Sequence, residues 1–263
     1  MRERAKQRST EVRARLPNFE RSYGPTADET LEILPVAKTG APVVLFVHGG
    51  RWMAQPENAF IYFADTVVAA GAHFVAARFV TLPPKPGGVR MPDMIDQLRR
   101  AVVWLYRNAA SFGGDPENIH VMGHSSGGHL TSVLLTTDWT RFGVPATVFK
   151  SGTCVSGMYD LRPVLLSARG DYVKLSAEEE DEFSAMRHLD RVRCPILVAY
   201  GDKEIPEFQR HGRTFSAALK EAGHKATPLV MAGCNHFEGI QTMTDPQSPL
   251  TKAVFRHMGL ATA

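Results

Sequence analysis

Short apolar runs alternate with longer amphipathic segments along most of this chain, and this alternation constrains the fold more than any other feature. Strand-like runs lie at residues 31–36, 42–50, 73–80, 147–157, 194–201 and 226–233. Helix-like segments lie at residues 57–71, 93–114, 206–223 and 249–258, and residues 118–137 contain a strand, a tight turn and a helix. Strands that alternate with helices form parallel sheets covered on both faces. We therefore predict an α/β fold with a mostly parallel central sheet and helices on both faces.

The alternation is interrupted at residues 158–191, which are more charged and include AEEEDEF at 177–183. A long irregular stretch between two strands is usually functional or disordered. We interpret it as a lid or cap excursion over the edge of the sheet, with an ordinary surface loop as the alternative. The chain has 263 residues and shows no internal repeat or linker, so we predict a single domain over residues 1–263.

Residues 1–22 form a basic N-terminal arm with seven Lys or Arg and three Asp or Glu, whereas the whole chain has a net charge of only +3. A basic arm can bind nucleic acid or anionic lipid. No second basic cluster follows it to build a nucleic-acid-binding face. We therefore expect a solvated helix that packs on the body of the protein, and neither nucleic acid nor a membrane as a partner.

The three cysteines, Cys154, Cys194 and Cys234, are widely spaced and form no CxxC pair. This pattern argues against a disulfide framework and against a cysteine-type zinc site. The N-terminus lacks the apolar segment of a secretory signal, and no apolar run approaches the roughly 20 residues that span a bilayer. We expect reduced thiols and a cytoplasmic protein.

The sequence GHSSGG at residues 123–128 lies between a predicted strand and a predicted helix. It matches G-x-S-x-G at Ser125, whereas Ser126 has His124 two residues before it and fails the pattern. A serine on a sharp strand-to-helix turn has a strained backbone, and glycine neighbours let the turn close. We predict that Ser125 is a nucleophile. The flanking His124 and His129 are interpreted as packing or supporting residues.

A second glycine-rich turn, HGG at residues 48–50, follows the strand-like run at 42–50. Glycines after a strand allow backbone N–H groups to point inward without a side chain in the way. Such donors suit an oxyanion hole, where they lie about 3 Å from the developing negative oxygen. We predict that Gly49, Gly50 and the Ser126 N–H form this hole. An ordinary strand-ending turn is the alternative.

Several motifs together resemble a known family. HGG followed by Trp52, FGGDPENI at 112–119, GHSSGGHL at 123–130, GMYDL at 157–161, PEFQR at 206–210 and a late NHF at 235–237 are similar to those of the α/β-hydrolase fold. Within that fold they resemble the arylformamidase (kynurenine formamidase) branch, near the hormone-sensitive-lipase-like esterases. The resemblance spans about residues 23–240. Two positions depart from the branch, which usually has Tyr where this chain has Arg51 and a small Ala where it has Ser126.

The resemblance implies a catalytic order of serine, acid and histidine along the chain. His236 follows the last predicted core strand and is the expected base. The acid is expected in the loop GDKE after the strand at 194–201, and the family spacing from Gly201 and from the following proline favours Glu204. Asp202 remains the second choice. The acid orients the imidazole and stabilises its cation.

These residues predict a serine hydrolase that cleaves a carboxylic ester or an N-formyl or aryl amide through an acyl-enzyme. A carboxylesterase for small esters is the alternative within the same chemistry, and a catalytically inactive binding protein of the same fold is an alternative of another class. Arg51, Trp52 and Tyr159 are expected to line the substrate pocket. No metal or organic cofactor is implied. The expected partner is a small-molecule ester or amide, and a homodimer is a possible oligomeric state.

Overall fold

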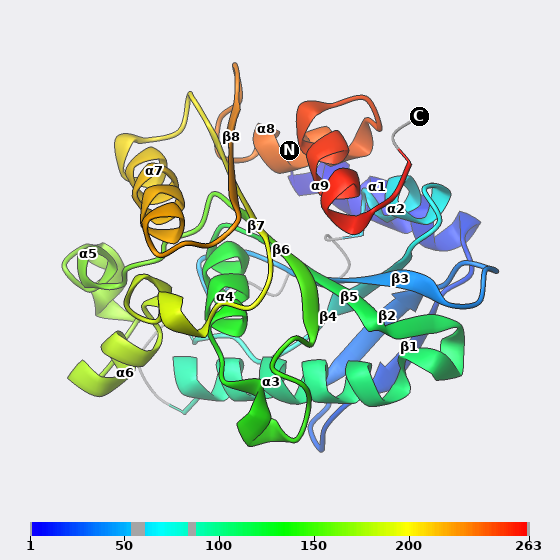
Figure 1. The fold of residues 1–263 in the computed structure, drawn as a ribbon, viewed down its shortest axis with the longest axis horizontal. Helices are drawn as coiled ribbons and strands as arrows, with labels where there is room; N and C mark the ends of the chain where they lie inside the picture. Colours follow the sequence, from blue (N-terminus) through cyan, green and yellow to red (C-terminus); the bar gives the residue numbers. More distant parts are fainter. Residues whose placement is uncertain (1, 54–60, 84–87, 262–263) are drawn as a thin grey trace.

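The computed structural model describes residues 2–53, 61–83 and 88–261. Within these ranges an eight-stranded sheet has the order β1-β2-β4-β3-β5-β6-β7-β8 (Figure 1). The strands are Phe19–Ser22 (β1), Thr30–Leu34 (β2), Ala41–Val47 (β3), His73–Ala77 (β4), Gly114–His124 (β5), Phe149–Val155 (β6), Ile196–Gly201 (β7) and Ala226–Met231 (β8). β1, β2 and β4 pair antiparallel, and every pairing from β4 to β8 is parallel. The predicted mostly parallel sheet is confirmed.

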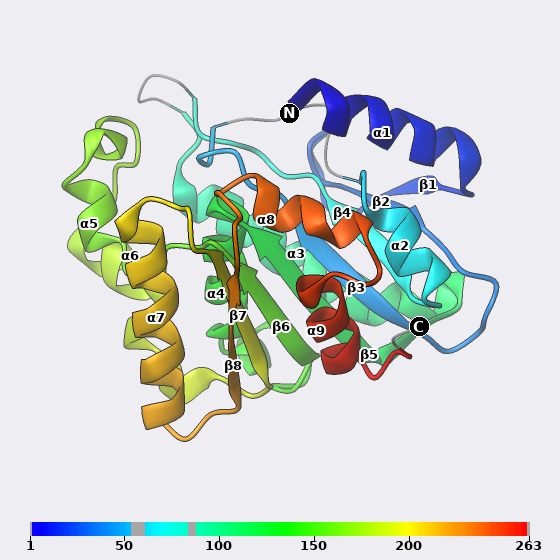
Figure 2. The same ribbon diagram turned by 90° about the horizontal axis from the view of Figure 1, so that it is seen from above.

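Helices cover both faces of this sheet (Figures 1 and 2). One face carries Met91–Asn108 (α3), Ser126–Leu135 (α4) and Pro206–Glu221 (α7). The other carries Arg2–Arg15 (α1), Ala64–Ala69 (α2), Glu238–Gln241 (α8) and Pro249–Met258 (α9). In the described part of the chain, none of the helices combines the length and the apolar character that a bilayer crossing requires.

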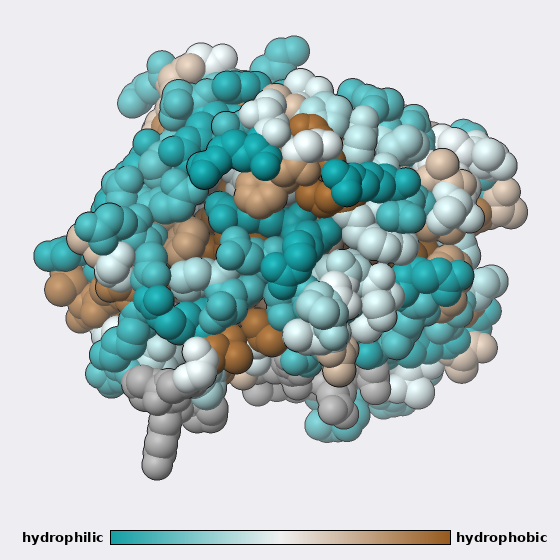
Figure 3. Space-filling view, turned by 90° about the horizontal axis from the view of Figure 1, so that it is seen from below, coloured by the Kyte–Doolittle hydropathy of each residue, from teal (hydrophilic) through white to brown (hydrophobic). Residues whose placement is uncertain are grey.

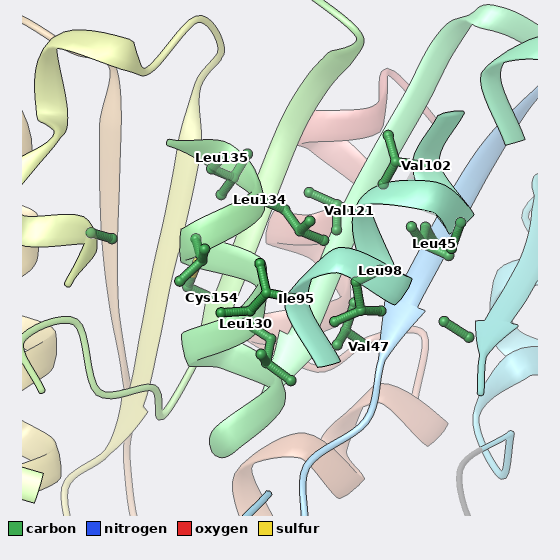
Figure 4. Packing of buried hydrophobic residues seen from close by; sticks show 14 of the residues in the cluster. Leu45, Val47, Ile95, Leu98, Val102, Val121, Leu130, Leu134, Leu135 and Cys154 are labelled. Atoms are coloured by element: carbon green, nitrogen blue, oxygen red, sulfur yellow. The ribbon is translucent and has the colours of Figure 1, made fainter. Parts of the chain in front are cut away.

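The core consists of two layers, one on each face of the sheet. Successive side chains of β3 alternate between them, with Val43, Leu45 and Val47 in one layer and Val44 and Phe46 in the other. All seven residues of β3 are buried, as expected of a central strand covered on both sides. Figure 4 shows the first layer, where aliphatic side chains of α3 and α4 pack on β3 and β5.

The helix α3 is apolar on the side that faces the sheet and polar on the side that faces solvent. On the inner side, Ile95, Leu98 and Val102 are almost completely buried. The molecular surface on this side is mainly hydrophilic, with hydrophobic side chains visible only in small separate patches (Figure 3). This division is typical of an amphipathic helix that docks on a sheet.

Some element boundaries differ from those predicted. The helix predicted at 93–114 ends at Asn108 and continues as a 3-10 turn, because Gly113 adopts a left-handed φ of 89° and begins the turn into β5. Of the helix predicted at 57–71, only Ala64–Ala69 is helical within the described residues, and 57–60 lie outside them. The basic arm contains α1 as expected but also β1, an edge strand that the polar sequence FERS does not indicate.

Residues 158–191 form short helical segments between β6 and β7, at the same end of the sheet as α7 (Figure 1). They are Arg162–Leu165 (α5), a 3-10 turn at Ala168–Asp171, Ala177–Glu182 (α6) and two further 3-10 turns at Ala185–Arg187 and Leu189–Arg191. Ser176 caps α6 with a capping box to Glu179, which fixes the start of this acidic helix.

The helix α1 docks through both apolar and polar contacts. Val12 is fully buried in the core layer of this face, and Arg13 Nε and Nη2 each donate to the Glu32 carboxylate over 2.6 Å. Glu32 lies in β2 and is 4% exposed, so its charge is buried and depends on this bidentate partner. Arg15 makes a more exposed ion pair with Asp65.

Replacing Arg13 by Ala should lower the free energy of unfolding by about 2–3 kcal/mol, because it leaves a buried carboxylate without its charged donor. Urea unfolding measures this loss. The matched control is Arg15→Ala, which should cost less than about 1 kcal/mol because its ion pair is solvent-exposed. Equal effects of the two substitutions would contradict the assignment of Arg13–Glu32 as the contact that docks α1.

Candidate active site

Ser125 lies at the sharp turn between β5 and α4. Its φ of 59° and ψ of −125° are a conformation that non-glycine residues rarely adopt. The turn is held by the Ser125 N–H, which donates to Val155 O over 2.9 Å, and by Ser125 O, which accepts from His129 N. The strained backbone is thus fixed by the neighbouring strand β6 and by the first turn of α4.

The glycines of the G-x-S-x-G pattern have a direct steric role. A Cβ atom on Gly123 would lie 2.2 Å from Gly127 O, and a Cβ atom on Gly127 would lie 2.1 Å from Val47 O. Both distances are shorter than real Cβ contacts, and the atoms met are backbone atoms that cannot rotate away. The turn can therefore pack against β3 only when both positions are glycine.

The structure brings Ser125, His236 and Glu204 into one hydrogen-bonded chain. Ser125 Oγ lies 2.9 Å from His236 Nε2, and His236 Nδ1 lies 2.8 Å from Glu204 Oε2. Because Nδ1 faces a carboxylate, it carries the ring proton, which leaves Nε2 free to accept the proton of the serine hydroxyl. The three residues follow β5, β8 and β7, whose carboxyl ends meet at one edge of the parallel sheet.

Glu204 is buried and fully hydrogen-bonded. Its Oε1 accepts from Ser156 Oγ over 2.5 Å and from Gly201 N over 2.7 Å, while Oε2 accepts from His236. Burial alone would raise the pKa of Glu204, but these three donors outweigh it and hold the pKa below the ordinary value of 4.5. The side chain is therefore an anion beside the imidazole at neutral pH.

Ser156 also contacts this group, although no sequence motif indicates it. It follows β6 and has a positive φ of 51°. Its N–H donates to Ala199 O, which fixes it against β7, and its hydroxyl donates to Glu204. The one signal in the sequence is its position after a strand, and this does not distinguish it from other loop serines.

Asp202, the second candidate acid, has a different partner. Its Oδ1 accepts from Gly233 N over 2.8 Å, and its backbone oxygen accepts from the Gln209 side chain. These bonds connect the loop after β7 to the turn after β8 and to the first turn of α7. The carboxylate that reaches the His236 ring is that of Glu204.

His236 is held by contacts on several sides. His124 Nε2 donates to His236 O over 2.8 Å, and the Phe208 ring packs on the imidazole with 4.2 Å between ring centroids. Burial lowers the pKa of His124 to about 3, with the nearby His236 contributing, so His124 is neutral and donates its single ring proton from Nε2. His124, a packing or supporting residue by its sequence position, makes this specific contact with the His236 backbone.

The HGG turn lies directly against the serine turn. A Cβ atom on Gly49 would lie 2.4 Å from His124 O and 3.1 Å from Ser125 Cβ. His48 Nδ1 donates to Gly49 O over 3.0 Å, which fixes this peptide. Among residues 2–53, 61–83 and 88–261, no acceptor is present for the N–H groups of Gly49 or Gly50. The turn therefore offers two backbone donors beside the serine.

Trp52 and Tyr159 lie in the core, whereas Arg51 is exposed. The Trp52 N–H donates to Ser126 Oγ, and its Nε1 donates to His129 Nδ1 over 3.1 Å. Tyr159 is fully buried, and its ring stacks on Phe215 with 4.1 Å between centroids. Both aromatic side chains are held by packing and hydrogen bonding within the core.

The depressed pKa of Glu204 predicts a pH-dependent contribution to stability. A carboxyl group with a lowered folded-state pKa stabilises the protein above its unfolded value, and this contribution is lost as the pH falls through the folded-state pKa. The difference in unfolding free energy between the wild type and Glu204→Gln should therefore be larger at pH 6 than at pH 3. Urea unfolding at both pH values measures it, and a difference that does not change with pH would contradict the buried, hydrogen-bonded carboxylate.

The chain is similar to known protein families and to curated relatives. The family model described as Prolyl oligopeptidase family matches residues 93–253, and the model described as BD-FAE matches residues 32–152. Kynurenine formamidase from Danio rerio is 30% identical over 244 residues, covering 90% of this chain and 80% of that protein. Its counterpart from Salmo salar is 28% identical over 245 residues, with the same coverage.

The fold is shared with solved esterases. The crystal structure of a thermostable esterase from Pseudomonas putida matches with a TM-score of 0.73 at 21% identity, covering 98% of this chain and 88% of that chain. The family models, the formamidase relatives and the sheet with its helices together confirm the resemblance found in the sequence. The chain therefore belongs to the α/β-hydrolase family, in its arylformamidase branch near the hormone-sensitive-lipase-like esterases, and is a hydrolytic enzyme.

Proposed function

We propose that Ser125, His236 and Glu204 are the catalytic residues with which this enzyme cleaves a carboxylic ester or an N-formyl aryl amide. The observation that carries the proposal is the unbroken chain of contacts from Ser125 Oγ to Glu204, with lengths of 2.9 and 2.8 Å. A serine hydroxyl is a weak nucleophile until an adjacent base takes its proton. His236 is within reach of that proton, and Glu204 holds the correct ring tautomer.

In the proposed mechanism Ser125 Oγ attacks the substrate carbonyl carbon while His236 Nε2 removes the hydroxyl proton. The N–H groups of Gly49, Gly50 and Ser126 stabilise the oxyanion of the tetrahedral intermediate. His236 then protonates the leaving alcohol or amine, and the acyl group stays on the serine. A water molecule, deprotonated by the same histidine, hydrolyses the acyl-enzyme. The residues use no metal or organic cofactor in these steps.

Two substrate classes fit this mechanism. The kynurenine formamidase relatives support an N-formyl aryl amide, from which an aryl amine leaves and a formyl group is hydrolysed from the serine. Arg51, which stands where the branch usually has tyrosine, favours a different substrate such as a small ester. A hydrolysis panel that compares N-formylkynurenine with short and aromatic esters ranks the two classes by kcat/KM.

The remaining features are proposals of the same kind. We propose that the described ranges belong to one domain over residues 1–263, in which residues 158–191 form a cap beside the site. The three cysteines are free, which supports a cytoplasmic protein with reduced thiols. The substrate is a small molecule. The protein is a monomer or a homodimer in solution, and analytical ultracentrifugation distinguishes the two.

Replacing Ser125 by Ala should lower the hydrolysis of p-nitrophenyl acetate by about 10³-fold or more, because the nucleophile is lost. The matched control is Ser126→Ala, which removes the neighbouring hydroxyl but keeps the backbone N–H. This control should retain most of the activity. Near-wild-type hydrolysis by Ser125→Ala would contradict the assignment of the nucleophile.

The same assay distinguishes the two acids, Asp202 and Glu204, of the loop between β7 and α7. Glu204→Gln should lower kcat by about 10³- to 10⁴-fold, because the amide cannot hold the imidazole in the productive tautomer or stabilise its cation. Asp202→Asn should change kcat little, since Asp202 bonds to the backbone of Gly233. A larger loss from Asp202→Asn than from Glu204→Gln would overturn the choice of acid.

A further inference from the structure

The HGG turn continues directly into a second tight turn, which spans Gly50 to Met53. Met53 N donates to Gly50 O over 3.1 Å, and the two central residues, Arg51 and Trp52, have φ values of 60° and 61°. Glycine, asparagine and aspartate are the usual residues where both central φ values are positive, because larger side chains are crowded there. This turn is therefore strained, and a strained backbone persists only where its surroundings hold it.

Trp52 is the residue through which the Gly50–Met53 turn is held. Its N–H donates to Ser126 Oγ over 3.1 Å, and its Nε1 donates to His129 Nδ1 over 3.1 Å. Its backbone oxygen accepts from Leu82 N over 2.7 Å. Two of these three bonds come from α4, the helix that begins directly after Ser125. The helix behind the proposed nucleophile thus also fixes the turn beside it.

The two bonds of the His129 ring fix its tautomer. An indole N–H can only donate and a carbonyl oxygen can only accept. Nδ1 faces Trp52 Nε1 and therefore carries no proton, whereas Nε2 lies 3.0 Å from Phe183 O and donates to it. The side chain is fully buried, and burial lowers the pKa of His129 to about 4, in agreement with a neutral ring.

Phe183 places the far end of this bridge in the segment between β6 and β7. The residue ends α6 and is 5% exposed. The next residue, Ser184, is tied to both ends of the segment, since its Oγ accepts from Leu161 N and donates to Glu180 O. One imidazole therefore connects three parts of the chain: the turn after β3, the helix α4 and the segment at residues 158–191.

We infer that His129 is a positioning residue: it holds Trp52 and, through Trp52, the strained turn that follows the oxyanion donors Gly49 and Gly50. The inference rests on the proposed hydrolase function, in which these two N–H groups stabilise the oxyanion. Both ring nitrogens of His129 are occupied by Trp52 and Phe183, so the ring takes no part in proton transfer. Because oxyanion donors act in the transition state, a displaced turn lowers kcat more than it changes KM.

Two amide substitutions separate the two bonds of the ring. Asparagine carries its oxygen as many bonds from Cα as histidine carries Nδ1, so His129→Asn keeps an acceptor for Trp52 but does not reach Phe183. Glutamine carries its nitrogen at the position of Nε2, so His129→Gln keeps the donor and loses the acceptor. With p-nitrophenyl acetate, His129→Gln should lower kcat by about 10- to 100-fold at a nearly constant KM. His129→Asn should keep kcat within about threefold of the wild type.

Trp52→Phe removes the same bond from the other side and keeps an aromatic ring. It should also lower kcat, and the double variant Trp52→Phe/His129→Gln should lose no more than the more impaired single variant, because one bond cannot be removed twice. This cycle keeps the inference testable if one single variant is unstable. The pH dependence of kcat should stay that of the wild type in every variant, since Ser125, His236 and Glu204 are unchanged.

His120→Gln is the matched control. His120 is 3% exposed, and its two ring nitrogens bond to the side chains of Ser151 and Asn118, so its replacement also removes bonds of a buried imidazole. In urea unfolding it should lower the stability as His129→Gln does, but it should leave kcat unchanged. Equal kcat losses in these two variants would overturn the positioning role.

Three further results would also overturn it: equal kcat in His129→Asn and His129→Gln, additive losses in the double variant, or a shifted pH profile. In each case hydrolysis of p-nitrophenyl acetate by the wild type, and its loss in Ser125→Ala, would still uphold the proposed function. A wild type that does not hydrolyse the ester would overturn both.

Discussion

The buried carboxylate of Glu204 connects the ends of three neighbouring strands. It accepts from Ser156 after β6, from Gly201 at the end of β7 and from His236 after β8. Each donor offsets part of the cost of burying the charge, and together they lower the pKa of Glu204. The same hydrogen bonds that stabilise the anion also hold the imidazole. The hydrogen bonding of Glu204 therefore determines both the local stability at the carboxyl ends of these strands and the geometry of the site.

Close backbone contacts complete this arrangement. A Cβ atom on Gly201 would lie 2.1 Å from Cys234 O, and a Cβ atom on Gly49 would lie 2.4 Å from His124 O. Glycine at these positions lets the loops after β7 and β8, and those after β3 and β5, touch without side chains between them. The site is therefore assembled by main-chain approach at the carboxyl edge of a parallel sheet, where ligands of open α/β sheets commonly bind.

The sequence was sufficient for features that depend on local pattern. A few consecutive residues indicate each of these features: the alternation of strands and helices, the serine turn, and the spacing from Gly201 to Glu204. β1 was missed because FERS is polar and becomes a strand only by pairing with β2 at the edge. Ser156 was missed because its role depends on a neighbour 48 residues away.

The substrate-binding predictions depend on long-range packing and stay predictions. Trp52 follows the HGG turn, where a pocket residue is expected, but its indole is 2% exposed and bonds to His129. Tyr159 opens the cap segment, yet its ring is stacked on α7. Hydrophobic periodicity and sequence motifs indicate to which strand, helix or turn a residue belongs. They do not tell whether an aromatic ring faces the pocket or the core, because this depends on which distant side chains fill the space around it.

The central claim is that Glu204 and His236 activate Ser125, one of two adjacent serines. Labelling with a fluorophosphonate, followed by peptide mass spectrometry, tests it most directly, since only an activated serine reacts rapidly with the probe. The account predicts a single adduct on Ser125 in the folded wild type. An adduct on Ser126 instead, or a folded protein that is not labelled at all and so acts as a binding protein, would contradict it.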